Sequence, residues 1–312
     1  MDMRAISQTR LGGPGVLTEI ELARPAPGPT EILVRVHAAG INPVDWKTRA
    51  AGVFLGEPPF VLGWDVSGVV EAVGLGVTLF APGDEVFGMP HFPRQAGAYA
   101  EYVAAPARQF ARKPAGLDHV HAAGLPLAGL TAWQALVDRA DVRPGQRVLI
   151  HAAAGGVGHL AVQIAKARGA YVIGTARAGK HELLRGLGAD ELIDYTAADF
   201  AEVLDPVDVV LDTVGGDYGP RSLAVLRTGG VLVSLTSPGE QDLAPQAARR
   251  GVRAGFLLVE PDRAGLMELA ALVEAGRLRV LVDTALPLAQ AATVHELGES
   301  GRTTGKIILT VA

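Results

Sequence analysis

The sequence contains no cysteine among its 312 residues. This absence excludes disulfide bonds, thiolate nucleophiles and every zinc site that needs cysteine ligands. The histidines offer no replacement, because His119 and His121 lie two residues apart in a segment that we expect to be a loop. We interpret these two as solvated side chains. The sequence therefore predicts no bound metal ion.

Long basic runs are also lacking, and the formal net charge is −5 at pH 7. Proteins that bind a phosphate backbone carry a basic patch, so we expect no nucleic-acid partner. The first ten residues lack the apolar segment of a signal peptide, which favours a cytoplasmic location. The longest apolar stretch, residues 148–165, is interrupted by His151, His159, Gln163 and three glycines. We expect a strand, a tight turn and a helix there, and no membrane span.

Hydrophobic residues make up 49% of the chain and charged residues 20%, a composition typical of globular proteins. At this length we expect two domains. Up to about Leu117 the sequence is rich in glycine and proline, with short β-branched runs at residues 32–36, 66–73 and 99–103. Short strands with frequent turns indicate a compact β domain, such as a partly open barrel.

The pattern changes near Ala122, where helical segments begin to alternate with short apolar runs. This alternation predicts a parallel sheet with crossover helices. The runs are residues 147–152, 171–176, 191–195, 207–213, 230–235 and 252–259. The last of them should form an edge strand, and an exposed edge invites pairing with a second subunit.

The C-terminal part returns to the β pattern of the first part. A helix is expected over residues 262–275, and two apolar runs follow at residues 279–288 and 306–311. We therefore expect the tail to complete the first domain, with the parallel-sheet domain inserted into it. The expected domains are residues 1–122 with 260–312, and residues 123–259.

A glycine turn follows the first strand of the inserted domain. The run AAAGGVG, residues 152–158, lies between that strand and an amphipathic helix, and it includes Ala154, Gly155, Gly156 and Val157. Such glycines let the backbone approach a pyrophosphate, which the unpaired N–H groups of the helix then bind. Ala153 replaces the first glycine of the G-x-G-x-x-G pattern, so a looser or differently shaped turn is expected. The alternative is a turn that only joins strand to helix.

The segment after the second strand predicts which dinucleotide binds. Sites specific for NAD carry an acidic residue here, but the strand ends at Thr175 and no acid precedes Glu182. Arg177 and Lys180 could instead pair with the 2′-phosphate of NADPH. We therefore expect NADPH, with two ordinary solvated charges as the alternative.

Eight motifs together resemble one enzyme family. They are GINPVDWK (40–47), GWDVSGVVEAVG (63–74), PGDEVFG (82–88), GAYAEYV (97–103), LAGLTAWQAL (127–136), AAAGGVG (152–158), LGADELIDY (187–195) and GKIIL (305–309). In this order they resemble the zinc-independent quinone oxidoreductases and enone reductases of the medium-chain dehydrogenase/reductase superfamily, over nearly the whole chain. Zinc-dependent alcohol dehydrogenases of the same superfamily have Gly-His-Glu where this chain has Gly63, Trp64 and Asp65.

The resemblance implies a GroES-like, partly open β-barrel domain and a doubly wound Rossmann domain, with the active site in the cleft between them. It implies that Asn42 contacts the nicotinamide ribose and that Thr131 lies beside the nicotinamide. It further implies that Lys180 and Tyr195 hold the 2′-phosphate. The turn residues and Thr175 complete the expected cofactor site. The family also implies a homodimer.

Without a metal ion, hydride transfer from NADPH is most plausible onto a quinone or an α,β-unsaturated carbonyl. Lys47, Asn42 and Thr131 are the candidates to stabilise the developing oxyanion or to supply its proton, with solvent as the fallback. Lys47 matches the lysine of the NPxDxK motif, which marks the branch of the family that includes plant-type enone reductases. The alternative role for Lys47 is a surface salt bridge with Asp45 or Glu57. A biosynthetic reductase of one dedicated intermediate, or a protein that binds NADPH without turnover, remain as other functions.

Several large side chains of the β domain are candidates for a substrate pocket. Five of them could line an apolar pocket for a flat acceptor, although such residues more often form the core. They are Trp46, Phe54, Trp64, Met89 and Phe92. Asp65 and Asp84 are expected in turns, with hydrogen bonds to the backbone.

Overall fold

The computed structural model describes residues 2–236 and 243–311. The chain forms two compact units, one made of residues up to Leu130 together with those from Glu260 onward, the other of Thr131–Val259. The sequence placed the first boundary at residue 122. Helix α3 (Pro126–Trp133) runs across the observed one.

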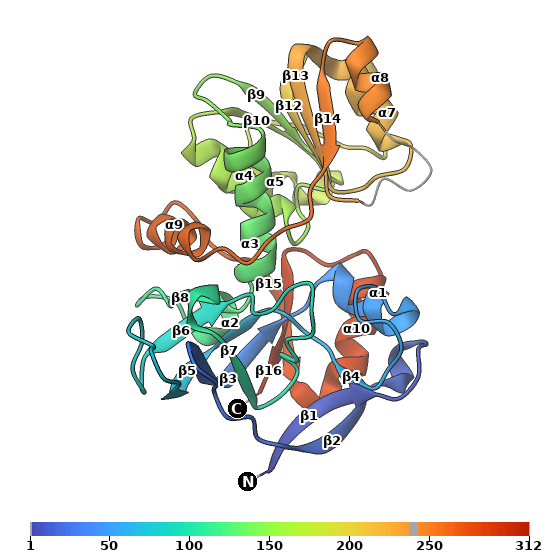
Figure 1. Cartoon of the computed structure of the whole chain (residues 1–312). Coiled ribbons are helices and arrows are strands. Elements are labelled where there is room, and N and C mark those ends of the chain that lie inside the picture. The colour runs from blue at the N-terminus through green and yellow to red at the C-terminus, as the bar shows by residue number, and fades with distance from the viewer. Residues whose placement is uncertain (1, 237–242, 312) are drawn as a thin grey trace. The chain divides into compact units, whose positions relative to one another are not determined.

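The first unit is built mainly from antiparallel strands (Figure 1). One seven-stranded sheet has the order β15-β16-β3-β5-β6-β8, with β7 pairing β3, and a smaller sheet has the order β2-β1-β4. The strands are β1 (Asp2–Gln8), β2 (Thr18–Ala23), β3 (Glu31–Gly40), β4 (Phe60–Val61), β5 (Val66–Val73), β6 (Glu85–Gly88), β7 (Tyr102–Pro106), β8 (Phe110–Arg112), β15 (Val282–Pro287) and β16 (Lys306–Thr310). Because β16 pairs β3, the C-terminal segment lies inside the main sheet of this unit.

Helices cover parts of these sheets. They are α1 (Pro43–Ala51), α2 (His119–Ala122), α9 (Arg263–Glu274) and α10 (Ala291–Glu299), with single turns η1 (Pro14–Val16), η2 (Ala107–Gln109) and η5 (Leu288–Gln290). Helix α1 starts at Asn42, where Pro43 suits the first helical position and Asp45 Oδ2 accepts the Asn42 N–H at 2.7 Å. It ends at Gly52, whose φ of 67° is left-handed. The local sequence therefore defines both ends of α1.

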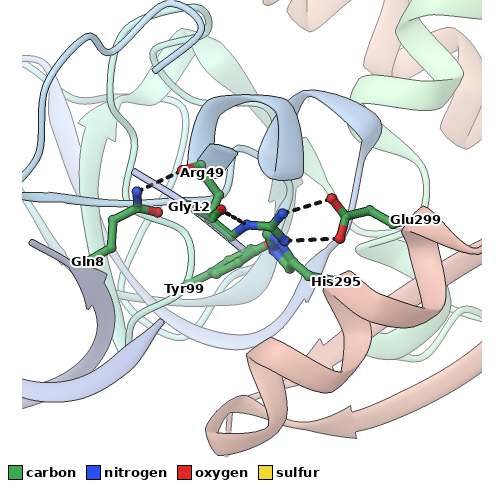
Figure 2. Close-up of polar contacts among 6 residues, drawn as sticks. All are labelled: Gln8, Gly12, Arg49, Tyr99, His295 and Glu299. Carbon is green, nitrogen blue, oxygen red and sulfur yellow. Dashed lines mark hydrogen bonds and ion pairs between the residues drawn. The ribbon is translucent and has the colours of Figure 1, made fainter. Parts of the chain in front are cut away.

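A buried guanidinium joins α1 to α10 (Figure 2). Arg49 is 2% exposed, donates to Glu299 Oε1 at 2.7 Å, and also donates to Gly12 O at 2.9 Å. Its other terminal nitrogen lies 3.1 Å from His295 Nδ1, and His295 Nε2 lies 3.1 Å from the Tyr99 hydroxyl. Helix α1 is thus held through its last turn as well as its cap.

The second unit contains one parallel sheet with the order β11-β10-β9-β12-β13-β14. Its strands are β9 (Arg147–Ile150), β10 (Tyr171–Thr175), β11 (Glu191–Ile193), β12 (Val207–Asp212), β13 (Leu226–Ser234) and β14 (Arg253–Phe256). The strand order reverses direction between β9 and β12, as in doubly wound Rossmann sheets. The predicted fold class is confirmed for this unit.

Helices of the second unit flank the sheet, with α4 and α5 on one side and α7 and α8 on the other (Figure 1). They are α4 (Gly158–Ala167), α5 (His181–Gly186), α6 (Phe200–Val203), α7 (Tyr218–Val225) and α8 (Ala244–Arg249), with η3 (Gln134–Arg139) and η4 (Ala178–Lys180). Residues 148–165 form strand, turn and helix, as predicted. Among the described residues no helix is long and apolar enough to cross a membrane.

Two local expectations were wrong. The strand expected at residues 99–103 begins only at Tyr102, because the backbone of Tyr99 instead bonds to Leu62 and Ile6. His119 and His121 lie on helix α2, not in a loop, since Asp118 caps that helix by accepting the His121 N–H at 2.8 Å.

His119 is also not solvated. Its side chain is 17% exposed and stacks on His37 with ring centroids 4.5 Å apart. Its Nδ1 lies 2.8 Å from Ser67 Oγ and its Nε2 lies 3.2 Å from Glu85. Although this order of groups resembles a hydrolase triad, Ser67 is fully buried and no substrate can reach it. The cluster is structural.

Candidate functional site

A buried polar network surrounds Asn42 at the start of α1. Asn42 Nδ2 donates to Asp65 Oδ2 at 2.8 Å, and Lys306 Nζ donates to Asn42 Oδ1. Lys306 also donates to Ile41 O at 2.9 Å and forms an ion pair with Asp65 at 3.4 Å. Asn42, Asp65 and Lys306 are 2%, 0% and 3% exposed, so water does not compete for these contacts.

The lack of a side chain at Gly40 leaves space for this network. Asp65 follows β4 and accepts the Leu127 N–H through Oδ1 at 2.7 Å. A Cβ at Gly40 would lie 2.8 Å from Asp65 Oδ2 and 2.2 Å from Ala123 O, so the site tolerates no side chain there. Burial raises the pKa of the Asp65 carboxyl, while the Lys306 ammonium and the N–H donors of Asn42 and Leu127 act against that shift.

Asp45 adds a second buried acid beside the network. It is fully buried, and its Oδ1 has no hydrogen-bond partner of normal geometry among the described residues. Burial raises its pKa to about 7; the Asn42 N–H, Lys306 and the Tyr99 hydroxyl oppose this rise, whereas the charge of Asp65 adds to it. Asp45 is thus a titratable group that is hydrogen-bonded to the backbone N–H of Asn42.

The hydrogen bonds behind Asp45 have a defined direction. Arg49 can only donate, so His295 Nδ1 accepts and its Nε2 carries the proton that is donated to the Tyr99 oxygen. Burial and the charge of Arg49 lower the pKa of His295 to about 3, which keeps the ring neutral. The Tyr99 O–H is left as a donor toward Asp45, and burial raises its pKa well above the ordinary value.

The glycine turn of the second unit has the features of a phosphate cradle. No acceptor among the described residues pairs with the backbone N–H groups of Gly156, Val157 and Gly158, where α4 begins. A Cβ at Gly158 would lie 2.3 Å from Ala152 O, so this position has room only for glycine. Ala152 has a φ of 45°, which turns the chain sharply after β9. These three N–H groups fit a pyrophosphate.

Thr175 supports the turn from the end of β10. Its Oγ1 accepts the Ala152 N–H at 3.2 Å and its carbonyl accepts the Ala153 N–H at 3.0 Å. It is 1% exposed, and its hydroxyl also lies 3.3 Å from Nδ1 of buried His151. The contacts of Thr175 therefore shape the backbone of the turn.

The predicted 2′-phosphate residues lie after β10 and β11. The Arg177 Nε donates to the Tyr195 hydroxyl at 3.0 Å, and Tyr195 is 42% exposed. Lys180 is half-buried and ends the turn η4 just before α5. Asp194, which follows β11, accepts the N–H groups of Ala178 at 3.1 Å and of Thr196 at 2.9 Å. Asp194 is thus engaged by the loop backbone.

A pocket of about 320 Å³ adjoins Tyr195. Its lining includes Phe200, Tyr218 and Arg221. Arg221 is held by Asp199 at 2.5 Å and by Asp217 at 3.2 Å, and its guanidinium lies 4.6 Å from the Phe200 ring. Because two carboxylates neutralise this arginine, the pocket is a poor site for an anion.

The other predicted catalytic residues have different environments. Lys47 is exposed on α1 and forms no ion pair with any residue that the structure describes, so neither Asp45 nor Glu57 binds it. Thr131 is 6% exposed on α3. The network around Asn42 includes neither residue.

Most of the residues considered for an apolar pocket belong to the core. Trp64 and Met89 are fully buried, and the Trp64 indole donates to Arg94 O at 2.7 Å. Phe92 is 6% exposed and packs edge-on against both Trp64 and Phe54. Only Phe54, at 48% exposed, is open to solvent in this cluster.

Comparisons with known proteins agree with these features. The family model described as "Alcohol dehydrogenase GroES-like domain" matches residues 28–115, and the one described as "Zinc-binding dehydrogenase" matches residues 187–309. A 2-haloacrylate reductase from a Burkholderia species is 37% identical, with 96% of each chain covered. The chain belongs to the quinone oxidoreductase and enone reductase family of the medium-chain dehydrogenase/reductase superfamily.

Two solved structures support this membership. The quinone oxidoreductase of Coxiella burnetii has a TM-score of 0.94 at 39% identity, with all of both chains covered. The Escherichia coli quinone oxidoreductase complexed with NADPH has a TM-score of 0.89 at 32% identity, covering 98% of this chain and 99% of that one. The chain is an oxidoreductase with a GroES-like domain and a Rossmann domain, as predicted.

Zinc, which one family model mentions, does not fit the residues of this chain. The sequence has no cysteine. Among the described residues no three histidines or carboxylates are placed to hold a metal ion. At the Gly-Trp-Asp motif, Asp65 is occupied by Asn42, Leu127 and Lys306. No step of the chemistry is therefore assigned to a metal.

Sequence reasoning missed Lys306 and assigned Asp65 only backbone contacts. The Leu127 N–H is such a contact, but the side chains of Asn42 and Lys306 bind the same carboxylate. The sequence does contain a signal: a lysine precedes the apolar residues of the strand KIILT, and a lysine buried in a strand needs a charged partner.

Proposed function

We propose that the protein is an NADPH-dependent reductase of quinones or α,β-unsaturated carbonyl compounds. The observation that carries the proposal is the hydrogen bond between Arg177 and Tyr195, at the end of the strand that follows the phosphate cradle. This hydrogen bond places a guanidinium and a phenol close together in the region where NAD-specific sites carry an acid that binds the ribose. A guanidinium can form charge-assisted hydrogen bonds with a phosphate.

Each part of NADPH has a proposed partner in the chain. The pyrophosphate lies against the turn of Ala154, Gly155, Gly156 and Val157, which Thr175 braces, and it binds the N–H groups of Gly156, Val157 and Gly158. The 2′-phosphate binds Arg177, Lys180 and Tyr195. Asn42 contacts the nicotinamide ribose, and Thr131 lies beside the nicotinamide. When bound, NADPH supplies a hydride.

The acceptor class follows from the residues available to polarise it. Since no group of side chains in the described part of the chain is placed to hold a metal ion, we infer an acceptor that is electron-poor by itself, as quinones and enones are. Hydride addition at the β-carbon leaves negative charge on the carbonyl oxygen. Lys47 is proposed to stabilise that oxygen and to donate the proton, because it is exposed and forms no ion pair with the described residues.

The relatives support this class of acceptor. One of them is named for reduction of a 2-haloacrylate, an activated alkene, and two are named quinone oxidoreductases. The E. coli protein was solved with NADPH. These names support both the cofactor and the acceptor class that we propose.

The experiment is a panel of acceptors assayed for NADPH oxidation, including 9,10-phenanthrenequinone, simple enones and 2-chloroacrylate. Turnover of several quinones or enones supports the proposal. Turnover of none of them, despite tight NADPH binding, would refute it and favour a binding protein or a reductase of one dedicated intermediate.

We also propose a homodimer joined through the edge of the Rossmann sheet. Strand β14 is the last in the sheet order, and Phe256 and Leu258 are 42% and 41% exposed. An unpaired edge with apolar side chains favours pairing with a second copy. Light scattering of the wild-type protein and of a Phe256→Asp/Leu258→Asp variant tests this; a monomeric wild type refutes it.

A further inference from the structure

The amide of Asn42 is held between two groups of opposite hydrogen-bonding character. Lys306 can only donate, and it binds the amide oxygen. Ionised Asp65 can only accept, and it binds the amide nitrogen at 2.8 Å. Turning the amide over would place donor against donor and acceptor against acceptor. The orientation of this side chain is therefore fixed by its neighbours.

The Lys306 ammonium has no hydrogen left for another role. Its three N–H groups are taken by Ile41 O, Asn42 Oδ1 and Asp65 Oδ2. With all three engaged, Lys306 has no N–H group to offer to a substrate. Asn42, in contrast, keeps one N–H of its Nδ2 and one lone pair of its Oδ1. The network thus leaves one defined donor on Asn42.

Asp65 also reaches the helix that carries Thr131. Its Oδ1 accepts the Leu127 N–H in the first turn of α3, and Thr131 lies four residues further along the same face of that helix. One carboxylate therefore holds both the Asn42 amide and the start of α3.

We propose that Asp65 and Lys306 are positioning residues, which fix the Asn42 amide so that its remaining N–H is the donor offered to the ribose of the nicotinamide. This rests on the proposed role of Asn42 in cofactor binding. Burying two charges is costly, and apolar replacements of such pairs are often no less stable. The pair is better explained by the orientation that it imposes than by stability.

The test variant is Asp65→Asn/Lys306→Met, which removes both buried charges together. The new amide at position 65 can still accept the Leu127 N–H, but its NH₂ then faces Asn42. Asn42 must turn over to offer its oxygen. We expect a folded protein, an NADPH dissociation constant raised about tenfold, as for loss of one hydrogen bond to cofactor, and shifted side-chain amide signals of Asn42 in ¹⁵N spectra.

Two further variants separate positioning from folding. Lys306→Arg, with Asp65 kept, retains the charge and the donors. Its NADPH affinity should therefore be close to that of wild type. The exchange Asn42→Asp/Asp65→Asn keeps one carboxylate beside Lys306 and an acceptor for Leu127, but it removes the donor at position 42. It should fold and bind NADPH as weakly as Asn42→Ala. This exchange keeps the inference testable even if the first variant does not fold.

The outcomes distinguish the two proposals. If Asn42→Ala weakens NADPH binding but Asp65→Asn/Lys306→Met and the exchange variant bind like wild type, the positioning role is wrong and the proposed function stands. If Asn42→Ala leaves NADPH binding unchanged, the proposed role of Asn42 is itself wrong. Weakened NADPH binding in both double variants, together with nearly wild-type binding in Lys306→Arg, supports the inference.

Discussion

The methyl group of Ala153 fills the space that a side chain at Gly174 would need. A Cβ built at Gly174 would lie 2.8 Å from Ala153 Cβ, and Ala153 is fully buried. The glycine missing from the first position of the dinucleotide turn is therefore compensated on the neighbouring strand β10. This explains how the turn accommodates an alanine where the family pattern has glycine.

Gly174→Ala should lower the free energy of unfolding by about 1–3 kcal/mol, because two methyl groups would compete for one space. Adding Ala153→Gly should recover most of that loss. Urea unfolding of both single variants and the double variant measures the coupling. Gly179→Ala is the control, since no atom lies within 4 Å of the Cβ built there. Purely additive effects would contradict this packing relationship.

Gly158→Ala should abolish NADPH binding by deforming the turn. Its Cβ would lie 2.3 Å from the backbone oxygen of Ala152, which cannot move aside as a flexible side chain could. Gly155→Ala is the matched control, because its Cβ would lie 3.2 Å from the same oxygen. Fluorescence titration with NADPH measures both. A wild-type affinity for NADPH in Gly158→Ala would show that the turn does not hold the cofactor.

Asp45 should make stability depend on pH. Its pKa is about 7 in the folded protein, above the ordinary aspartate value of 3.8, so the folded state binds more protons between these values. Its contribution is therefore complete at acidic pH and is lost as the pH rises to about 7, with a slope of about 1.4 kcal/mol per pH unit.

Asp45→Asn should remove this slope while keeping an acceptor for the Asn42 N–H. Unfolding free energies measured from pH 4.5 to 7.5 test it, with Glu57→Gln, at an exposed position, as the control. The same slope in wild type and in Asp45→Asn would place the responsible group elsewhere.

Lys47→Ala should lower kcat about a hundredfold with an enone, the loss expected when a general acid is removed. Stability should not change, because Lys47 is exposed and has no partner among the described residues. Lys47→Arg keeps the charge but not a proton of suitable acidity, so it should recover only part of the rate. Unchanged turnover of several enones and quinones by Lys47→Ala would remove this lysine from the mechanism.

Local patterns predicted most of the fold. Strand, turn and helix over residues 148–165 follow from a short apolar run, a glycine cluster and an amphipathic segment, each only a few residues long. The edge strand near residue 253 and the helix after Asp262 follow in the same way. The error at His119 arose from a local signal that was overlooked, the N-cap residue Asp118.

The network around Asn42 could not be predicted in this way. Asp65 and Lys306 are 241 positions apart, and they meet only because β16 pairs with β3 inside the main sheet. Sequence reasoning placed the C-terminal strand in the right domain but had no register for it. A lysine in an apolar strand indicates that it has a charged partner. Only the register shows that this partner is Asp65.

The most direct test of the whole account is the ratio of kcat/KM for NADPH to kcat/KM for NADH, measured with wild-type protein and one shared acceptor. The account predicts a preference for NADPH of at least about tenfold, the value of one charge-assisted hydrogen bond to the 2′-phosphate. Arg177→Ala should reduce that preference. Equal efficiency with the two cofactors would contradict the roles given to Arg177, Lys180 and Tyr195.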